Sequence, residues 1–213
     1  MSFDNFARWY QTLERIAFGN SLQRSRVACL DQILTPKRVL IIGEGDGRFL
    51  LELLRIHPAI DIDCVDSSER MLQLARRRVE KELGNSGKNV RWFCQDLMLW
   101  DPSKNSYDLI VTHFVLDCFP AHQVGVVVQK LKNAATDSAD WLFADFRMPT
   151  TGLARIHSLV WLKAMYLFFR VTTGITADQL IDATPFLERE GFQLVQRHLF
   201  RWGMLRSEIW RRL

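Results

Sequence analysis

The chain has 213 residues, of which 48% are hydrophobic and 24% are charged. This composition excludes a globally disordered chain, and the length suits one domain with its own core. The formal net charge is only +4, with 24 acidic residues interspersed among 28 basic ones, so charge alone does not favour a nucleic-acid partner.

The cysteines are widely spaced and form no CxxC pair, which argues against a zinc site or a disulfide framework and fits a reducing, cytoplasmic location. Cys64 and Cys94 lie in apolar runs, where cysteine is usually a small core residue. The first residues, MSFDNFARWYQ, lack the apolar segment of a signal peptide.

Residues 1–34 are predicted to be helical. Apolar residues recur there at the spacing of one helix face: Phe3, Phe6, Tyr10 and Leu13. Gly19 and Asn20 should break this helix, and a second one should run through residues 22–34, before Pro36 ends it.

Short apolar strands and amphipathic helices then alternate. The strands are predicted at 38–42, 60–65, 90–94, 107–112 and 141–146, and the helices at 46–57, 68–83 and 121–134. This alternation indicates βαβ crossovers and a parallel sheet with both faces covered. The basic face of the second helix, with Arg76, Arg77, Arg78 and Lys81, is expected in solvent.

The pattern changes after Pro149. The apolar stretch 159–169 is too short to span a bilayer and is interrupted by Lys163, so a buried helix, a lid over an apolar pocket and an interfacial helix remain open. Residues 176–179, TADQ, are typical of a capping box that opens a helix closed by Gly191. Runs 192–201 and 205–211 predict an antiparallel hairpin, whose arginines should face solvent.

Residues 39–50, VLIIGEGDGRFL, place three alternate glycines between a strand and a helix. In a doubly wound fold this turn is where ligands bind, because the backbone can approach them closely. A dinucleotide fingerprint would need a small residue at position 48, which is Arg48, and no GK[ST] follows as in a P-loop.

Two carboxylates follow the next two strands. Asp66 is placed to accept hydrogen bonds from ribose hydroxyls, although it could also cap the next helix. Asp96 is placed to accept from an adenine amine, with Leu97 and Met71 packing the ring. An ordinary turn aspartate is the alternative for Asp96.

Together these motifs resemble the class I S-adenosylmethionine-dependent methyltransferase family, over residues 37–146. The matching elements are the glycine motif, Asp66-Ser-Ser-Glu-Arg-Met-Leu72, Gln95-Asp-Leu97 and Tyr107-Asp-Leu-Ile-Val111. One position departs from the family, which usually has an acidic residue where this chain has Ile41. Glu44, within the loop, is a candidate substitute.

The resemblance implies an α/β, Rossmann-like, doubly wound seven-stranded sheet, mostly parallel with an antiparallel C-terminal hairpin. It further implies one domain, 1–213, with a helical cap (1–36), a cofactor-binding core (37–148) and a C-terminal part with a lid helix (149–213). The implied cofactor is S-adenosyl-L-methionine, with S-adenosyl-L-homocysteine as product. Its implied contacts are Tyr10, Gly43, Glu44, Gly45, Gly47, Asp66, Ser67, Met71, Asp96, Leu97 and His113.

The implied reaction is in-line transfer of the sulfonium methyl group to a small-molecule acceptor, driven largely by positioning. His113 and Asp117 follow the fourth strand and are candidates for a general base or a substrate contact. Asp145 and Arg147 end the fifth strand and are candidates to line the pocket, and Arg147, His157 and Tyr166 are further candidate substrate contacts. The apolar stretch 159–169 favours a lipophilic or aromatic acceptor, and no carboxylate cluster indicates a metal.

Three alternatives stay open. The basic pI, about 9.0, and the C-terminal arginines favour an RNA methyltransferase. Ile41 favours a non-catalytic cofactor-binding module, and a nicotinamide oxidoreductase is disfavoured by Arg48. Peripheral membrane contact is possible through 159–169, and the acceptor and the oligomeric state are left undetermined.

Overall fold

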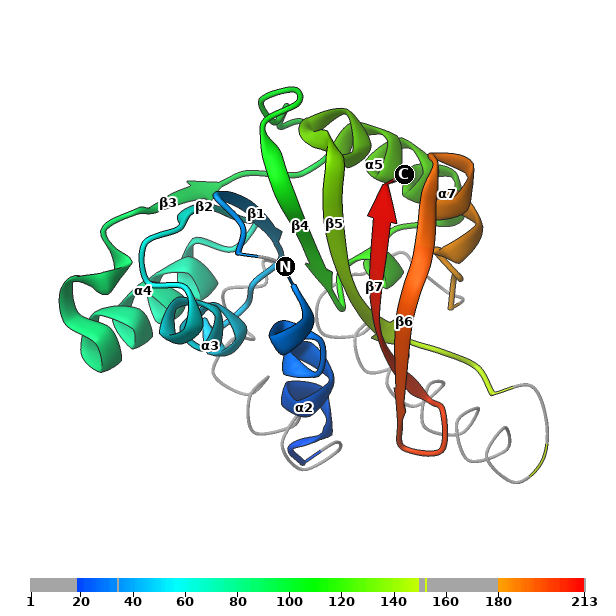
Figure 1. Cartoon of the computed structure of the whole chain (residues 1–213), viewed down its shortest axis with the longest axis horizontal. Coiled ribbons are helices and arrows are strands. Elements are labelled where there is room, and N and C mark those ends of the chain that lie inside the picture. Colours follow the sequence, from blue (N-terminus) through cyan, green and yellow to red (C-terminus); the bar gives the residue numbers. More distant parts are fainter. Residues whose placement is uncertain (1–18, 34, 150–151, 153–179, 213) are drawn as a thin grey trace.

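The computed structural model describes residues 19–33, 35–149, 152 and 180–212 (Figure 1). Seven strands form one sheet in the order β3-β2-β1-β4-β5-β7-β6. In chain order they are β1 (Arg38–Ile42), β2 (Asp61–Asp66), β3 (Val90–Cys94), β4 (Tyr107–His113), β5 (Ala135–Phe146), β6 (Phe192–Phe200) and β7 (Leu205–Arg212). Strands β1 to β5 pair in parallel, whereas β7 runs antiparallel to both β5 and β6, which confirms the predicted architecture.

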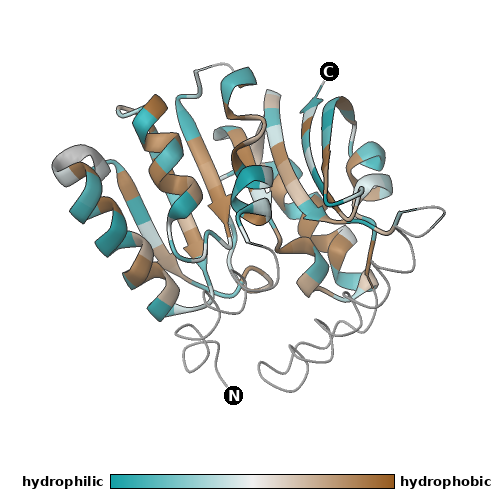
Figure 2. Ribbon diagram, turned by 90° about the horizontal axis from the view of Figure 1, so that it is seen from below, coloured by the Kyte–Doolittle hydropathy of each residue, from teal (hydrophilic) through white to brown (hydrophobic). Residues whose placement is uncertain are grey.

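Helices cover both faces of the sheet, as the hydropathy-coloured ribbon shows (Figure 2). The α-helices are α2 (Ser21–Val27), α3 (Arg48–Ile56), α4 (Glu69–Leu83), α5 (Ala121–Ala134) and α7 (Thr184–Arg189). The short 3-10 turns are η2 (Leu30–Gln32), η3 (Gly84–Gly87) and η4 (Leu116–Cys118). In the described part of the chain, every helix falls short of the length and apolar character needed to cross a bilayer.

The core consists of one large apolar cluster on each face of the sheet. Successive residues of a strand point to opposite faces, and β1 shows this directly: Val39 and Ile41 join the cluster under α3, whereas Leu40 and Ile42 join the cluster under α5. A strand buried on both faces needs an uninterrupted apolar run, which explains why these short runs could be predicted.

The second predicted N-terminal helix is shorter than expected. Helix α2 ends at Val27, and the chain continues through Cys29 into the separate turn η2. Cys29, Leu30 and Ile33 all enter the core below α3. Packing of these side chains outweighs the helical periodicity on which the prediction relied.

The helix predicted from the capping box at 176–179 also differs. That box lies outside the described residues, and 180–183 are not helical. Helix α7 begins at Thr184, with Pro185 in its first turn. Proline lacks the N–H that a helix interior needs, so it is accommodated at this start.

Two predictions about single side chains are wrong. Cys94 is exposed rather than buried, because it is the last residue of β3 at the sheet edge. Arg206 does not face solvent as predicted for the hairpin arginines, since its side chain is only 2% exposed. Arg206 lies over the ring of Phe143, with its guanidinium carbon 4.8 Å from the ring centroid.

Candidate active site

The glycine loop, residues 43–47, lies at the carboxyl ends of the parallel strands. Its three glycines have φ angles of +65°, +73° and +84°, a region that L side chains rarely adopt. A Cβ on Gly43 would lie 2.6 Å from Val115 Cγ2, and one on Gly47 would lie 2.6 Å from the Ala75 Cα. A Cβ on Gly45 would meet nothing within 4 Å. Two of the glycines therefore permit packing within the protein, and Gly45 borders open space.

Asp66, the last residue of β2, ties this loop to the start of α4. Its Oδ2 accepts a hydrogen bond from the Gly45 N–H at 3.3 Å, and its Oδ1 accepts from the Ser68 N–H at 2.9 Å. Ser68 is in turn the N-cap of α4, accepting from the Met71 N–H. The half-buried carboxylate thus fixes the loop beside the one glycine that has room for a ligand.

The next predicted residues lie along the same edge. The Gln95 N–H donates to the Asp66 carbonyl, which places the turn after β3 beside the end of β2. Asp96 is exposed there, and its Oδ1 accepts from the Met98 N–H at 2.8 Å. Ser67 is exposed, whereas Met71 and Leu97 are 5% exposed each and belong to the protein surface only at their tips.

Asp46, also in the loop, anchors it to both flanking helices. Its carboxylate binds Arg48 Nε at 3.0 Å and Arg78 Nη2 at 2.8 Å. Arg78 also donates to the Asp46 carbonyl. Arg78 is therefore half-buried and structural, unlike the exposed Arg76 and Arg77 of the same helix, and the prediction of a wholly solvated basic face is wrong at this position.

Glu44 is a second buried acid of the loop, while Ile41 packs in the core. The Glu44 Oε1 accepts from the Leu50 N–H at 2.9 Å, so this side chain caps α3, whose N-cap residue is a glycine without a side chain. Burial raises the pKa of Glu44 to about 8, against the lowering effects of the Leu50 hydrogen bond and of Arg26.

Arg26 is a site residue that the sequence reasoning missed. It is 9% exposed and projects from α2, with its guanidinium carbon 5.3 Å from the Phe114 ring centroid. Its charge acts on both Glu44 and His113. A basic residue beside the buried Leu22 and Ser25 of a short helix is the signal that could have indicated it.

His113, the last residue of β4, faces α3. Its ring lies edge-on to Phe49, with centroids 4.5 Å apart, and Nδ1 has no hydrogen-bond partner among the described residues. Burial, helped by the nearby Arg26 charge, lowers the pKa of His113 to about 3. The imidazole is therefore neutral near pH 7 and a weak proton acceptor, which favours a contact role over that of a base.

Asp117 lies in η4, the turn after β4, and is 6% exposed. Burial raises its pKa to about 6, while a hydrogen bond from the adjacent Cys118 thiol, 3.7 Å from Oδ1, opposes the shift. Asp117 is the better-suited of the two predicted base candidates, because its pKa lies closer to neutral pH.

Four further predicted site residues remain: Tyr10, Arg147, His157 and Tyr166. Tyr10, His157 and Tyr166 lie outside the described residues. Arg147 follows β5 and turns toward the hairpin: its N–H donates to the Met204 carbonyl at 2.7 Å, and its Nη1 lies 3.5 Å from where a Cβ on Gly203 would be. Across the described ranges, no group of three His, Cys, Asp or Glu side chains could hold a metal ion.

Comparison with known proteins supports a methyltransferase. The model of the "methyltransferase domain" family matches residues 39–137. A demethylmenaquinone methyltransferase from Thermotoga maritima is 25% identical over 217 residues, 93% of this chain and 89% of that protein. Polyamine aminopropyltransferase 2 from Bacillus cereus is 29% identical over 147 residues, 69% of this chain, which spans only 31% of that longer protein.

Among solved structures, the N-methyltransferase NodS from Bradyrhizobium japonicum WM9, in complex with S-adenosyl-L-homocysteine, has a TM-score of 0.61. It is 16% identical, and the match covers 90% of this chain and 83% of that one. Together with the glycine loop, Asp66 and the seven-stranded sheet, these similarities support a class I S-adenosylmethionine-dependent methyltransferase.

Proposed function

We propose that this chain binds S-adenosylmethionine along the carboxyl edge of β1 to β4 and transfers its methyl group to a small-molecule acceptor. The observation that carries the proposal is the open space at Gly45, held in place by the Asp66 carboxylate. The chemistry supplied by the bound cofactor is an electrophilic methyl group on a sulfonium, released as S-adenosylhomocysteine is formed.

Each residue has a role that its geometry supports. Gly45 lets the backbone approach the cofactor, because it carries no side chain on its open side. Asp66 accepts from the ribose hydroxyls while keeping its loop contacts, and the exposed Asp96 accepts from the adenine amine. Met71 and Leu97 contribute the apolar rim on which the base rests, and the exposed Ser67 contributes a polar contact.

The charged side chains of the site favour a cofactor that carries both a positive charge and a carboxylate group. The acidic side chains Asp66, Asp96 and Asp117 lie along or just behind this edge, where a sulfonium gains Coulomb energy in a partly desolvated site. Arg26 is the cation nearest the glycine loop in the described α2, and we assign it the methionine carboxylate of the cofactor. His113 provides a neutral contact next to it.

A small organic acceptor fits better than RNA. The arginines that favoured RNA are largely engaged within the protein: Arg206 binds Asp182, Arg211 binds Asp140 and Arg212 binds Asp137. The demethylmenaquinone methyltransferase, by its name, acts on demethylmenaquinone, and we propose an organic acceptor with an apolar body for this chain. The apolar stretch that suggested such a body, 159–169, lies outside the described residues.

Calorimetric titration with S-adenosylhomocysteine tests the cofactor site. Asp66→Asn should weaken binding at least about tenfold, because it removes a charged acceptor. The matched control is Asp108→Asn, since Asp108 also accepts two backbone hydrogen bonds, from Lys37 and Arg38, but at the opposite end of the sheet. Equal affinities of the two variants would contradict the proposed site.

Transfer of label from methyl-labelled S-adenosylmethionine then separates an enzyme from a cofactor-binding module. Label should appear in small acceptors and not in RNA. If the cofactor binds tightly but label enters only RNA, the proposed acceptor class is wrong, whereas binding without transfer to any acceptor favours the non-catalytic alternative.

A further inference from the structure

A second carboxyl group lies behind Asp117 and was not among the predicted catalytic residues. Asp145, near the end of β5, is 0% exposed. Its Oδ1 accepts from the Phe146 N–H at 2.8 Å, and its Oδ2 is buried without a hydrogen-bond partner in the part of the chain that is described. A buried polar atom left unpaired is costly, and it indicates a place for a group that is supplied from outside the chain.

Asp145 and Asp117 act on each other. Burial raises the pKa of Asp145 well above its ordinary value, and the Asp117 charge adds to this shift. Asp182 acts in the same direction and Arg206 in the opposite one. The two carboxyls therefore form a buried pair in which Asp145 holds its proton more tightly than Asp117.

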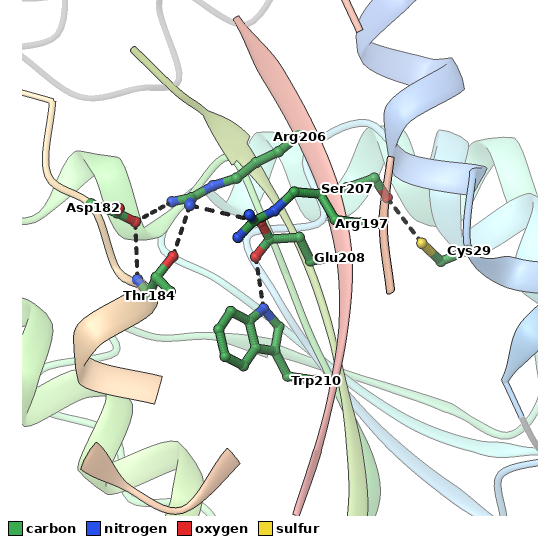
Figure 3. A network of polar contacts seen from close by, with 8 residues as sticks. All are labelled: Cys29, Asp182, Thr184, Arg197, Arg206, Ser207, Glu208 and Trp210. Carbon is green, nitrogen blue, oxygen red and sulfur yellow. Dashed lines mark hydrogen bonds and ion pairs between the residues drawn. The ribbon is translucent and has the colours of Figure 1, made fainter. Parts of the chain in front are cut away.

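The nearest arginine does not neutralise this pair. Arg206 is opposite Asp145 in the β5–β7 register, yet its guanidinium turns to Asp182 at 2.7 Å and to the Thr184 hydroxyl at 2.8 Å (Figure 3). Its remaining contact is Glu208, 3.7 Å away, and Glu208 is itself bound by Arg197 and Trp210. Among described residues, Arg206 Nε is also buried and unpaired.

The pair is next to the proposed methyl donor. Turn η4, which carries Asp117, packs against β5, which carries Asp145. Val115, the residue before this turn, packs against the glycine loop: a Cβ on Gly43 would lie 2.6 Å from the Val115 Cγ2 atom. The Phe114 N–H donates to the Ala144 carbonyl, which joins the same two strands at their ends.

We infer that the acceptor presents an N–H or O–H group to the carboxyl pair Asp117–Asp145, so that methylation occurs on nitrogen or oxygen and not on carbon. This inference rests on the proposed methyl transfer. A neutral carboxyl can both donate and accept, so Asp145 Oδ2 can bind an amine or a hydroxyl and orient it.

The step balances with these two groups. A lone pair of the acceptor nitrogen or oxygen forms the new bond to the methyl carbon, and the carbon–sulfur bond breaks with its electron pair left on sulfur. The acceptor atom then loses its proton to the Asp117 carboxylate, which returns it to solvent. No oxidant or metal is required.

The test measures binding of three matched probes to the protein saturated with S-adenosylhomocysteine: benzylamine, benzyl alcohol and toluene. Ligand-observed NMR gives their dissociation constants. The amine or the alcohol should bind at least about tenfold more tightly than toluene, as expected for a hydrogen bond to a buried ionisable group. A preference for either polar probe over toluene supports the inference.

Asp145→Leu should remove this preference, because leucine has a similar size but no group that donates or accepts a hydrogen bond, and Asp140→Leu should keep it. Asp140 is a matched control, because it lies on the same strand but is paired with Arg211. If Asp145→Leu does not fold, Asp117→Leu replaces it with the same expected loss. Equal binding of toluene, no binding of any probe, or a preference that survives in both carboxyl variants would overturn the inference. Failure of the wild type to bind S-adenosylhomocysteine would instead reject the proposed function.

Discussion

The glycine loop and the Asp117–Asp145 pair meet at one edge of the sheet, but they are built in opposite ways. In the loop the polar groups have partners: the Gly43 N–H donates to the Val65 carbonyl, the Gly45 N–H to Asp66, and Glu44 caps α3. In the pair, Asp145 Oδ2 is buried without a partner among the described residues.

This difference indicates that the cofactor and the acceptor are recognised in different ways. In the proposed function, the loop recognises S-adenosylmethionine by its backbone shape, which is complete before binding and costs little to reorganise. The carboxyl pair depends on side chains that become fully hydrogen-bonded only with a ligand. Variants of the loop glycines should therefore show which positions stabilise the fold and which contact the ligand. Variants of Asp117 and Asp145 should affect the acceptor instead.

The largest effect is expected for Gly47→Ala. The new Cβ would lie 2.6 Å from a backbone atom of α4, the Ala75 Cα, at a φ of +84°. The free energy of unfolding should fall by about 3 kcal/mol or more, combining overpacking with backbone strain. Urea denaturation measures this. Gly191→Ala is the control, because its φ is +86° and its Cβ would meet nothing within 4 Å, and it should cost only about 1 kcal/mol.

Arg206→Met should come next. Removal of this arginine leaves the buried Glu208 with one cation fewer and frees Asp182. We expect a loss of about 2–4 kcal/mol in unfolding free energy, typical of breaking a buried charge network. Arg76→Met, which breaks an exposed pair with Glu80, should cost under about 0.5 kcal/mol. Similar values for the two would show that the hairpin network is not a stabilising element.

Gly45→Ala should have the opposite effect to Gly47→Ala: a small loss of stability and a large loss of ligand affinity. Its Cβ has room, so unfolding free energy should fall by only about 1 kcal/mol from the φ of +73°. The affinity for S-adenosylhomocysteine should fall at least about tenfold, because the methyl group occupies space that the ligand needs. A variant that is unstable but binds normally would contradict the distinction between these two glycines.

A further effect concerns pH. Because the pKa of Glu44 is raised from 4.5 to about 8, the folded state binds the proton more tightly than the unfolded state between these values. Stability contributed by this group is therefore present below pH 4.5 and is lost as pH rises to 8, by at most about 1.4 kcal/mol per pH unit. Depression of the His113 pKa to about 3 has the opposite sign, but it acts only below about pH 6.5.

Glu44→Gln should flatten this dependence between pH 6.5 and 8. Thermal unfolding of the ligand-free wild type should show a melting temperature that falls across this window, and the variant should show a smaller fall. Parallel curves for the two proteins would show that Glu44 is ionised throughout and that its burial is compensated.

Much of the fold follows from local signals. Short apolar runs predicted the exact bounds of β1 and β3. The glycine motif and Asp66 predicted the edge of the sheet proposed for the cofactor, because the backbone conformation there depends on residues that are adjacent in sequence. The start of α7 was missed although Pro185 indicated it. Strand β5 begins at Ala135, earlier than predicted, because polar Asp140 is paired with Arg211 across the sheet.

The acceptor side was harder to predict. The burial of Arg206, the reach of Arg26 into the site and the unpaired Asp145 oxygen all depend on segments that are far apart in sequence. Single charged residues carry no local signal that separates a solvated position from a buried one. The sequence patterns therefore indicated the cofactor more sharply than the acceptor.

The most direct test of the central claim is an amide NMR map of the protein titrated with S-adenosylhomocysteine. The account predicts the largest shifts at residues 43–47, 66–68 and 96–98, with η4 following, and little change at Lys37 and Arg38 on the opposite edge. Absence of shifts in a folded sample, or shifts centred on that opposite edge, would contradict a cofactor site at the glycine loop.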